Sequence, residues 1–350
     1  GSTSIQNDNI NLLRKKKIKE LFQLKNKINK HDIISFDLFE TLIHRSLGKP
    51  RDIFYLLDNY VKKELKLKID FFSIRLKEAI NSRNNITGIE EIYKDIKSET
   101  NLSKENLYKI LLKEQDLEYK LACPNQHLLE TLKFAKKRKK KILITTDFHM
   151  GKTVISRILK KCKILQYDDL FISSEIKKSK ISGTMFQHLN QKYPGKKILH
   201  IGDNIISDFE IPKKYKISAF KIINPTDLML SMKLSESYLL AKSLFEKIFL
   251  GLIQNKIYQN FFYDRNSKAN YIKIRDLNTF GYLFFGAITI SYLFWINKAV
   301  KNKNINNIFF CSRDGYALMK LFKNIFKKRV EENNVVYLKT SRFLSFNIGF

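Results

Sequence analysis

Five short apolar runs, separated by stretches with helical spacing, constrain the fold of this chain more than any other feature. The first run, Ile33-Ile34-Ser35-Phe36, ends at Asp37. The later runs lie at 141–146, 170–173, 197–201 and 218–222, and segments with helical periodicity separate them. Apolar strands that alternate with helices are typical of a parallel, doubly wound sheet. We therefore predict an α/β fold built on such a sheet.

Changes in pattern along the chain predict its domain organisation. Residues 1–30 read as a basic N-terminal helix, and residues 31–225 contain the apolar runs. The stretch 51–119 is charged and helical in period, so it forms an insertion after the first strand. Beyond Asn224-Pro225 the sequence becomes rich in Phe, Tyr and Leu, which predicts a second, helix-rich α/β domain over 226–350. A strand-like run lies close to Phe350, so we expect this domain to be cut short there, and the sequence leaves open whether the natural chain continues.

The run from Leu277 to Ile296 has two interpretations. It contains no charged residue and is long enough to span a bilayer. However, it carries Asn278, Thr279 and other polar residues, and a fresh strand-and-turn pattern follows at 308–315. We therefore predict a buried helix of the second domain rather than a membrane span.

The chain is strongly basic, with 65 Lys and Arg against 34 Asp and Glu and a formal net charge of +31. Such a charge can attract nucleic acid, an anionic membrane surface or a phosphorylated substrate. The lysines are scattered, and the two dense runs at 14–17 and 136–141 lack the interleaved aromatic residues that stack on bases. We do not expect nucleic-acid binding, and we leave open a peripheral contact with an anionic membrane.

The three cysteines, Cys123, Cys162 and Cys311, are far apart in the sequence and form no CxxC pair. This spacing argues against a disulfide framework or a zinc site, and it fits a reducing compartment. We expect a cytoplasmic protein, with peripheral contact at the inner face of the membrane left open.

Polar groups follow each of the first four apolar runs, where open α/β sheets bind their ligands. Asp37 through Thr41 follow the first run, and Thr146-Asp147 close the second. Lys180 follows the third run, with Lys177 and Lys178 as rivals, and Gly202-Asp203 through Asp208 follow the fourth. Each alone has an ordinary explanation, such as a helix cap or a turn. Together they indicate a functional site at one edge of the sheet.

This order of motifs resembles the haloacid dehalogenase superfamily. Its hydrophobic strand followed by DxxxT matches residues 34–41, and its second strand, which ends in Ser or Thr, matches residues 142–146. Its lysine is best placed at Lys180, and its GDxxxxD motif matches residues 202–208. The resemblance covers about residues 32–225. It implies a Rossmann-like sheet, with the insertion at 51–119 in the place of the family's first type of helical cap.

The resemblance implies a nucleophile and its supporting groups. A carboxylate such as Asp37 can attack phosphorus and form an aspartyl-phosphate, which divides one difficult displacement into two easier steps. The Thr146 hydroxyl and the Lys180 ammonium would hold the phosphoryl oxygens where negative charge builds up.

A magnesium ion is the implied cofactor, because two anions do not meet without a neutralising cation. Asp37 and Asp203 would ligate Mg²⁺, and by resemblance the backbone carbonyl of Phe39 would be a third ligand. Asp208 would support the ion directly or through water. The neighbouring polar residues that are candidates for substrate binding are Thr41, Asp147, His149 and Asn204.

One residue departs from the phosphatase pattern of this superfamily. Phosphatases usually carry a second Asp two places after the nucleophile, which protonates the leaving group, and here Phe39 stands there. The dehalogenase branch has an aromatic residue at this place, but Gly202-Asp203-Asn204 is phosphatase-like and favours magnesium chemistry. Glu40 could replace the acid or could simply cap the following helix, so the general acid stays unassigned.

A narrower likeness connects residues 36–42, 146–149 and 312–316 with predicted hydrolases that are associated with glycosyltransferases in bacterial surface-polysaccharide synthesis. It implies a sugar-phosphate or lipid-linked phosphate substrate. We therefore expect a Mg²⁺-dependent phosphate-ester hydrolase. The alternative is a catalytically weak binding module that docks on an anionic membrane or on a polysaccharide-assembly partner.

Overall fold

The computed structural model describes residues 20–82, 86–231, 240–257 and 276–340. The chain forms two compact units, residues 1–271 and residues 272–350. The basic helix expected over 1–30 lies in part outside the described residues, and residues 20–29 are helical.

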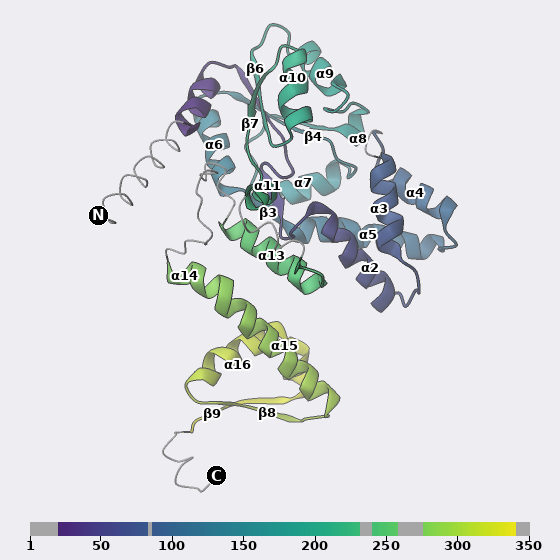
Figure 1. Ribbon diagram of the computed structural model, residues 1–350, viewed down its shortest axis with the longest axis vertical. Coiled ribbons are helices and arrows are strands. Elements are labelled where there is room, and N and C mark those ends of the chain that lie inside the picture. Colours follow the sequence, from purple (N-terminus) through teal and green to yellow (C-terminus); the bar gives the residue numbers. More distant parts are fainter. Residues whose placement is uncertain (1–19, 83–85, 232–239, 258–275, 341–350) are drawn as a thin grey trace, which may run out of the picture. The chain divides into compact units, whose positions relative to one another are not determined.

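A five-stranded parallel sheet forms the centre of the first unit (Figure 1). Its strand order is β5-β4-β1-β6-β7, and every neighbouring pair is parallel. This topology confirms the predicted Rossmann-like doubly wound sheet. The strands are β1 (Ile33–Phe36), β4 (Lys141–Thr146), β5 (Asp169–Ile172), β6 (Ile198–Gly202) and β7 (Ser218–Lys221).

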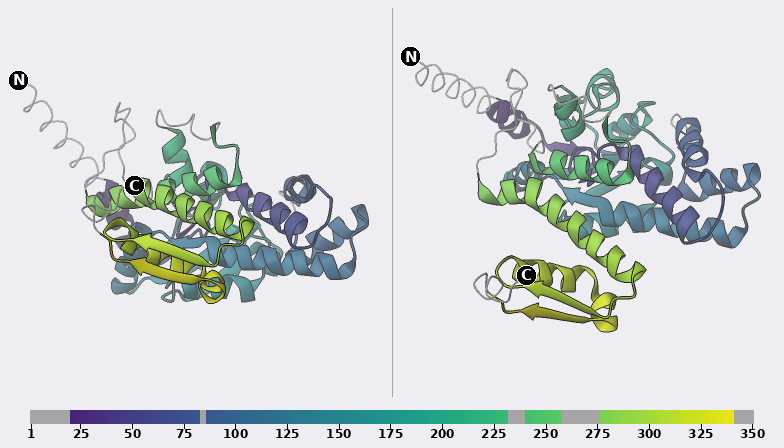
Figure 2. Two further views of the ribbon diagram at one scale, coloured as in Figure 1. Left: turned by 90° about the horizontal axis from the view of Figure 1, so that it is seen from below. Right: turned by 60° about the horizontal axis from the view of Figure 1, so that its bottom comes forward.

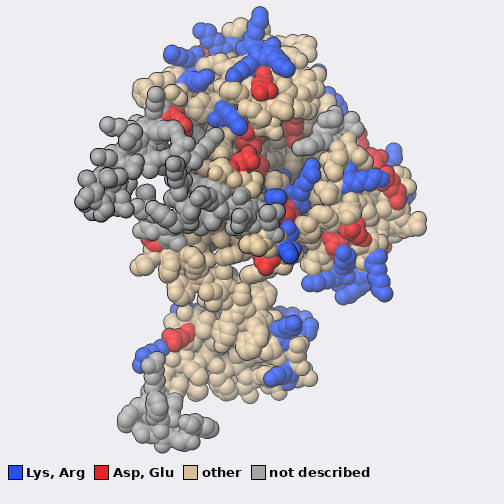
Figure 3. All heavy atoms as spheres, in the orientation of Figure 1, with Lys and Arg blue, Asp and Glu red and all other residues tan. Residues whose placement is uncertain are grey.

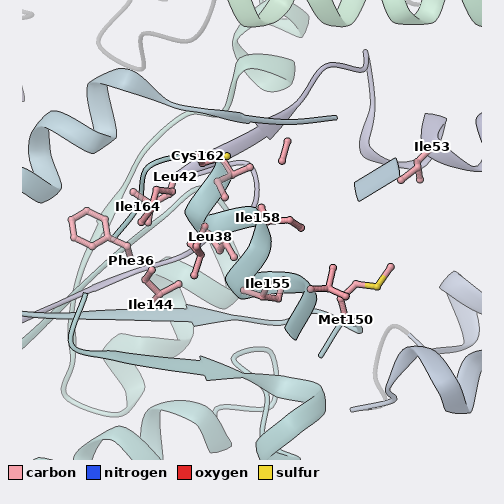
Figure 4. Close-up of a cluster of buried hydrophobic side chains, with 14 of the residues drawn as sticks. Phe36, Leu38, Leu42, Ile53, Ile144, Met150, Ile155, Ile158, Cys162 and Ile164 are labelled. Carbon is pink, nitrogen blue, oxygen red and sulfur yellow. The ribbon is translucent and has the colours of Figure 1, made fainter. Parts of the chain in front are cut away.

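Both faces of the sheet are buried against apolar side chains. Successive side chains of a strand point to opposite sides, so each strand contributes to both faces. Ile34 and Phe36 of β1 belong to one apolar cluster, while Ile33 belongs to another. Figure 4 shows Phe36 and Ile144 gathered in the first cluster with Ile155 and other residues of α7 (Lys152–Lys161). Helix α9 (Thr184–Lys192) contributes Met185, Phe186 and Leu189 to the second cluster. The remaining helices around the sheet are α6 (Gln126–Lys137), α8 (Ser173–Ile176), η3 (Ile205–Glu210) and α10 (Ile211–Lys214).

The insertion between β1 and β4 is helical, and residues 50–121 are called the cap below. A short antiparallel pair, β2 (Ile43–Arg45) with β3 (Ala122–Pro124), joins its two ends. The cap projects to one side of the sheet (Figures 1 and 2). Its elements are η1 (Pro50–Asp52), α2 (Ile53–Lys63), α3 (Phe71–Asn81), α4 (Ile89–Glu99) and α5 (Lys104–Leu121).

The first unit extends past the domain boundary that the change in composition predicts at residue 226. Helices α11 (Pro225–Leu230) and α13 (Leu244–Ile257) pack against each other, and α13 also packs on β2. Gly251 approaches the backbone of Leu47 so closely that an added Cβ would lie 2.3 Å from its carbonyl carbon. The described part of 226–257 therefore belongs with the sheet and the cap.

The second unit has a small core of its own, made by Leu293, Phe310, Phe322 and their neighbours. Strands β8 and β9 are parallel, and α16 packs on both of them. Helix α15 packs on α16. The expectation that Leu277–Ile296 is buried is wrong: α14, η4 and α15 form one run, Leu277–Asn302, and only 11% of its most apolar stretch is buried. By length and composition alone this run could cross a bilayer. The elements are α14 (Leu277–Phe280), η4 (Gly281–Phe285), α15 (Gly286–Asn302), β8 (Asn307–Cys311), α16 (Asp314–Ile325), α17 (Lys327–Glu332) and β9 (Asn334–Leu338).

Candidate active site

A cavity of about 440 Å³ lies where the carboxyl ends of the strands meet the cap. Asp37 follows β1, Thr146 ends β4, and Asp203 follows β6, so the parallel register brings these groups to one edge. All three line the cavity together with Lys180 and Asp208. Residues that are far apart in the sequence thus share one site, as the motif pattern predicts.

Lys180 connects the nucleophile candidate with the last acidic residue of the motif series. Its Nζ lies 2.5 Å from Asp37 Oδ1 and 2.6 Å from Asp208 Oδ1, and all three side chains are almost fully buried. Lys177, one of the rivals, instead bonds Glu91 and the carbonyl of Ile86 in the cap. Of the three lysines, only Lys180 lines the cavity, so the geometry selects Lys180 as the lysine of this site.

Asp208 is fixed by close packing and by several hydrogen bonds. An added Cβ on Gly202 would lie 2.5 Å from Asp208 Cβ, so only glycine lets this side chain approach β6. The backbone amide of Asn204 donates to Asp208 Oδ2 at 3.0 Å, and His200 Nε2 lies 3.1 Å from Oδ1. These contacts fix the direction in which Asp208 presents its carboxylate to Lys180.

The buried ionisable groups of the site shift one another's pKa values. Burial raises the pKa of Asp37, although Lys180 opposes the shift. Burial, Asp37 and Asp208 together raise the pKa of Asp203 well above its usual value. Burial also acts against the charged form of Asp208, but the contacts of its carboxylate with Lys180 and His200 together outweigh burial and lower that pKa. If all three carboxylates were ionised, the site would carry more negative charge than Lys180 alone neutralises, and this repulsion adds to burial in raising the pKa of Asp203.

This donor set fits a magnesium ion. Oxygen atoms of Asp37, Asp203 and Asp208 all lie within 4.8 Å of one another. Carboxylate oxygens are the hard ligands that Mg²⁺ prefers, and a divalent cation would relieve the repulsion that raises the pKa of Asp203. Phe39, the remaining candidate ligand through its backbone carbonyl, also lines the cavity.

The other predicted residues occupy different places around this group. Thr146 is buried and lines the cavity. Thr41 donates to Asp203 Oδ1 at 3.3 Å and lies beneath the site. Asp147 accepts from the backbone amides of Lys180 and Ile181 at 2.8–3.2 Å, so its carboxylate holds the lysine loop.

Asn204 and His149 both line the cavity and have partners within the protein. The side chain of Asn204 caps η3 by accepting from the backbone amides of Ile206 and Ser207. His149 Nε2 lies 3.3 Å from Glu114 in the cap, so it links the loop after β4 to the cap.

Comparison with solved structures gives matches at low identity. A 2-haloacid dehalogenase from Pseudomonas syringae pv. Tomato DC3000 is 11% identical, with a TM-score of 0.43 over 56% of this chain and 87% of that one. A HAD phosphatase from Thermococcus onnurineus is 17% identical, with a TM-score of 0.39 over 55% of this chain and 86% of that one. A haloacid dehalogenase-like family hydrolase from Xanthomonas campestris is 12% identical, with a TM-score of 0.40 over 55% and 83%. No family model and no curated protein matches the sequence. Because these structures include a dehalogenase as well as a phosphatase, the likeness does not choose between the two reactions.

The motif analysis did not predict two residues of the site, Asn224 and Arg75. Asn224, after β7, donates to Asp203 Oδ2 at 2.7 Å and so orients a candidate metal ligand. Its position at the end of the fifth apolar run could have revealed it. Arg75 of α3 lines the cavity from the cap. The sequence signal for Arg75 is its spacing from Phe71 and Glu78. This spacing places a charged residue on the buried face of α3.

Proposed function

We propose that the chain is a Mg²⁺-dependent hydrolase of phosphate esters that uses Asp37 as its nucleophile. The observation that carries this proposal is the buried group of Asp37, Asp203 and Asp208 around Lys180, which opens into a cavity next to the cap. Three carboxylates with a single fixed lysine favour binding of a hard cation and an anionic substrate. Displacement of a halide from carbon has no need of this surplus of negative charge.

In the proposed reaction, each side chain of the site has a role. A carboxylate oxygen of Asp37 attacks phosphorus, the bond from phosphorus to the ester oxygen breaks, and an aspartyl-phosphate forms. Lys180 and Thr146 line the cavity and would stabilise the charge that gathers on the phosphoryl oxygens. Water then attacks the aspartyl-phosphate, which releases inorganic phosphate and regenerates Asp37.

Asp37, Asp203, Asp208 and the carbonyl of Phe39 would hold the magnesium ion. When bound, it supplies the positive charge that lets the anionic nucleophile approach an anionic phosphate. Asn224 and Thr41 keep Asp203 directed at this position through their hydrogen bonds.

The proposal extends to the setting of the reaction. We infer a sugar-phosphate or lipid-linked phosphate as the substrate and a role in surface-polysaccharide synthesis in the cytoplasm or at the inner face of the membrane. This part depends on the resemblance of the sequence motifs, and a screen of phosphorylated sugars against other phosphate esters tests it.

The central test compares turnover of phosphate esters with and without Mg²⁺ for the wild type, Asp37→Asn and Asp203→Ala. We expect Asp37→Asn to abolish turnover and Asp203→Ala to raise the magnesium concentration that is required. Asp32→Asn is the matched control, because Asp32 precedes the other end of β1 and bonds the backbone amide of Lys197. It should leave turnover unchanged.

Three outcomes separate the alternatives. Turnover by Asp37→Asn near the wild-type rate contradicts the nucleophile. Full activity in chelator that still requires Asp37 points to metal-free displacement, such as dehalogenation. No turnover of any ester by the folded wild type favours the binding module.

A further inference from the structure

Arg75 is a buried arginine of the cap. One edge of its guanidinium group makes hydrogen bonds within the protein, and the other edge makes none to the described residues. Arg75 is 1% exposed, and its Nε and Nη2 donate to the Glu114 carboxylate at distances between 2.8 and 3.2 Å. Tyr93 donates to the same carboxylate at 2.7 Å, and the Arg75 guanidinium carbon lies 4.8 Å from the centre of the Phe54 ring. These contacts fix the plane of the guanidinium before any ligand arrives.

The remaining nitrogen, Nη1 of Arg75, is buried and has no hydrogen-bond partner among the described residues. A guanidinium stays charged in a protein, and a buried N–H without an acceptor is unfavourable. Buried polar atoms of this kind are rare, because folded chains satisfy nearly all of them. The free edge of Arg75 therefore calls for an acceptor that the described chain does not supply.

The place of Arg75 shows where that acceptor would come from. Arg75 and Ala79 of α3, and Ser82 directly after this helix, line the same cavity as Asp37. Displacement at phosphorus proceeds in line, so the leaving group departs on the side away from Asp37. The sheet supplies Asp37, and the cap supplies the facing wall, with Phe54 and Arg75 in it.

We infer that Nη1 of Arg75 binds an oxyanion on the leaving group, so that the substrate carries a second anionic group besides the phosphate that is cleaved. The inference rests on the proposed phosphate-ester hydrolysis. A carboxylate and a second phosphate both accept from a guanidinium edge, and Arg suits both because its donors are planar and rigid. Glu114 holds Arg75 in place and is a positioning residue for this contact.

The test uses two matched pairs of esters that differ by one anionic group. The carboxylate pair is 3-phosphoglycerate and glycerol 3-phosphate, and the phosphate pair is fructose 1,6-bisphosphate and fructose 6-phosphate. In one of the pairs, the wild type should show a kcat/KM at least tenfold higher for the more anionic member, since a charged hydrogen bond is worth about ten- to a hundredfold. The pair that shows the preference identifies the kind of group.

Arg75→Lys should reduce that ratio at least fivefold, because one ammonium still pairs with Glu114 but offers no second edge. Lys77→Ala is the control, since Lys77 lies on the same helix, is 58% exposed and bonds Glu99 on the surface. It removes a positive charge from α3 and should leave the ratio unchanged. If Arg75→Lys does not fold, Arg75→Gln combined with Glu114→Gln removes the buried pair together and takes its place.

Titration of the same ligand pairs into the Asp37→Asn protein by calorimetry separates this inference from the proposed function. Tighter binding of the more anionic ligand, without hydrolysis by the wild type, would overturn the hydrolase and keep the assignment of Arg75. Hydrolysis without a preference in either pair, or with a preference that persists in Arg75→Lys, would overturn the assignment alone. Neither hydrolysis nor a binding preference would overturn both.

Discussion

In the proposed reaction, Phe39 and Glu40 occupy the positions from which the leaving group would receive its proton. The Phe39 ring lies 4.2 Å from the Phe148 ring, between centroids, and the Arg45 guanidinium lies 4.4 Å from its centre. Glu40 has a positive φ of 62°, and its carboxylate accepts from Arg45 at 3.1 Å. Burial alone would raise the pKa of Glu40, but its contact with His44 and the charge of Arg45 outweigh it and lower the pKa. Glu40 is thus held as a carboxylate, and Phe39 has no proton to give.

We predict that cleavage depends on how well the leaving group carries negative charge without help. A positioned general acid accelerates such steps by about a hundredfold to ten-thousandfold. The wild type should therefore cleave p-nitrophenyl phosphate at least about a hundredfold faster than glycerol 3-phosphate, as measured by kcat/KM. Glu40→Gln should leave the ratio unchanged, because the ionised Glu40 donates nothing.

Two results would contradict this prediction in different ways. A selective loss of rate on glycerol 3-phosphate in Glu40→Gln would make Glu40 the acid. Similar rates on both esters in both proteins would place the acid elsewhere, and His149, which lines the cavity, would be the first residue to replace.

At the level of elements, the strands of the sheet were predictable because each carries its own signal. Ile142 to Thr146 form an apolar run that fits a strand buried on both faces, and the polar residues behind such runs converge because all strands are parallel. The site residues Asp37, Thr146, Lys180 and Asp203 follow from this rule together with the resemblance.

The cap contacts were not predictable in the same way. Helical spacing predicts α3 and α5 as helices, but the partner of Arg75 is Glu114, which lies on a different helix. Nothing in the spacing of either segment specifies that pairing, since it depends on how α3 and α5 pack. Exposure of Leu277–Asn302 was missed for a related reason: an uncharged run does not tell which elements cover it.

The buried pair of Arg75 and Glu114 connects the helices of the cap, and we predict that it makes stability depend on pH. Burial opposes the charged form of Glu114, but the contacts of its carboxylate with Arg75 and His149 together outweigh burial and lower the pKa. A carboxyl group whose pKa is lower in the folded state stabilises the fold above its unfolded pKa of about 4.3. That stabilisation is lost as the pH falls from there towards the folded pKa.

Glu114→Gln should therefore lower the free energy of unfolding at pH 7 by about 3 kcal/mol, because it leaves the Arg75 charge buried without its counter-ion. The difference from the wild type should shrink at pH 3. Urea unfolding at both pH values measures this. Glu105→Gln on the same helix is the control, since Glu105 is exposed and its surface pair with Lys109 contributes little to stability. A difference for Glu114→Gln that is as large at pH 3 as at pH 7 would contradict the proposed role of the pair.

At the scale of the whole molecule, the net positive charge is the main electrostatic feature. Figure 3 shows Lys and Arg side chains scattered over the visible face, with Asp and Glu among them. Several lysines pair with acidic neighbours, as Lys77 does with Glu99 and Lys109 with Glu105. A spread charge of +31 favours solubility and a general attraction of anions. Contact with an anionic membrane stays a prediction.

Each of the two units has its own hydrophobic core, and every residue that lines the cavity with Asp37 belongs to the first. In the second unit, Leu277 is 88% exposed, Ile288 67% and Trp295 63%, all along one helical run. An apolar surface of this kind promotes association. The two units therefore differ in their expected contribution to catalysis and to solubility.

We predict that a chain ending at residue 257 keeps the turnover of the full chain and associates less. A chain that ends at residue 231 should be less stable, because it loses α13, whose Gln254 donates to Thr226 at 2.8 Å and whose Asn255 donates to the carbonyl of Arg45 at 2.6 Å. Light scattering, thermal unfolding and turnover of the three proteins measure these differences. If the chain ending at 257 is folded but inactive, the second unit supplies part of the site. If it associates as strongly as the full chain, the exposed run at 277–302 is not the cause, and another surface of the first unit must carry the contact.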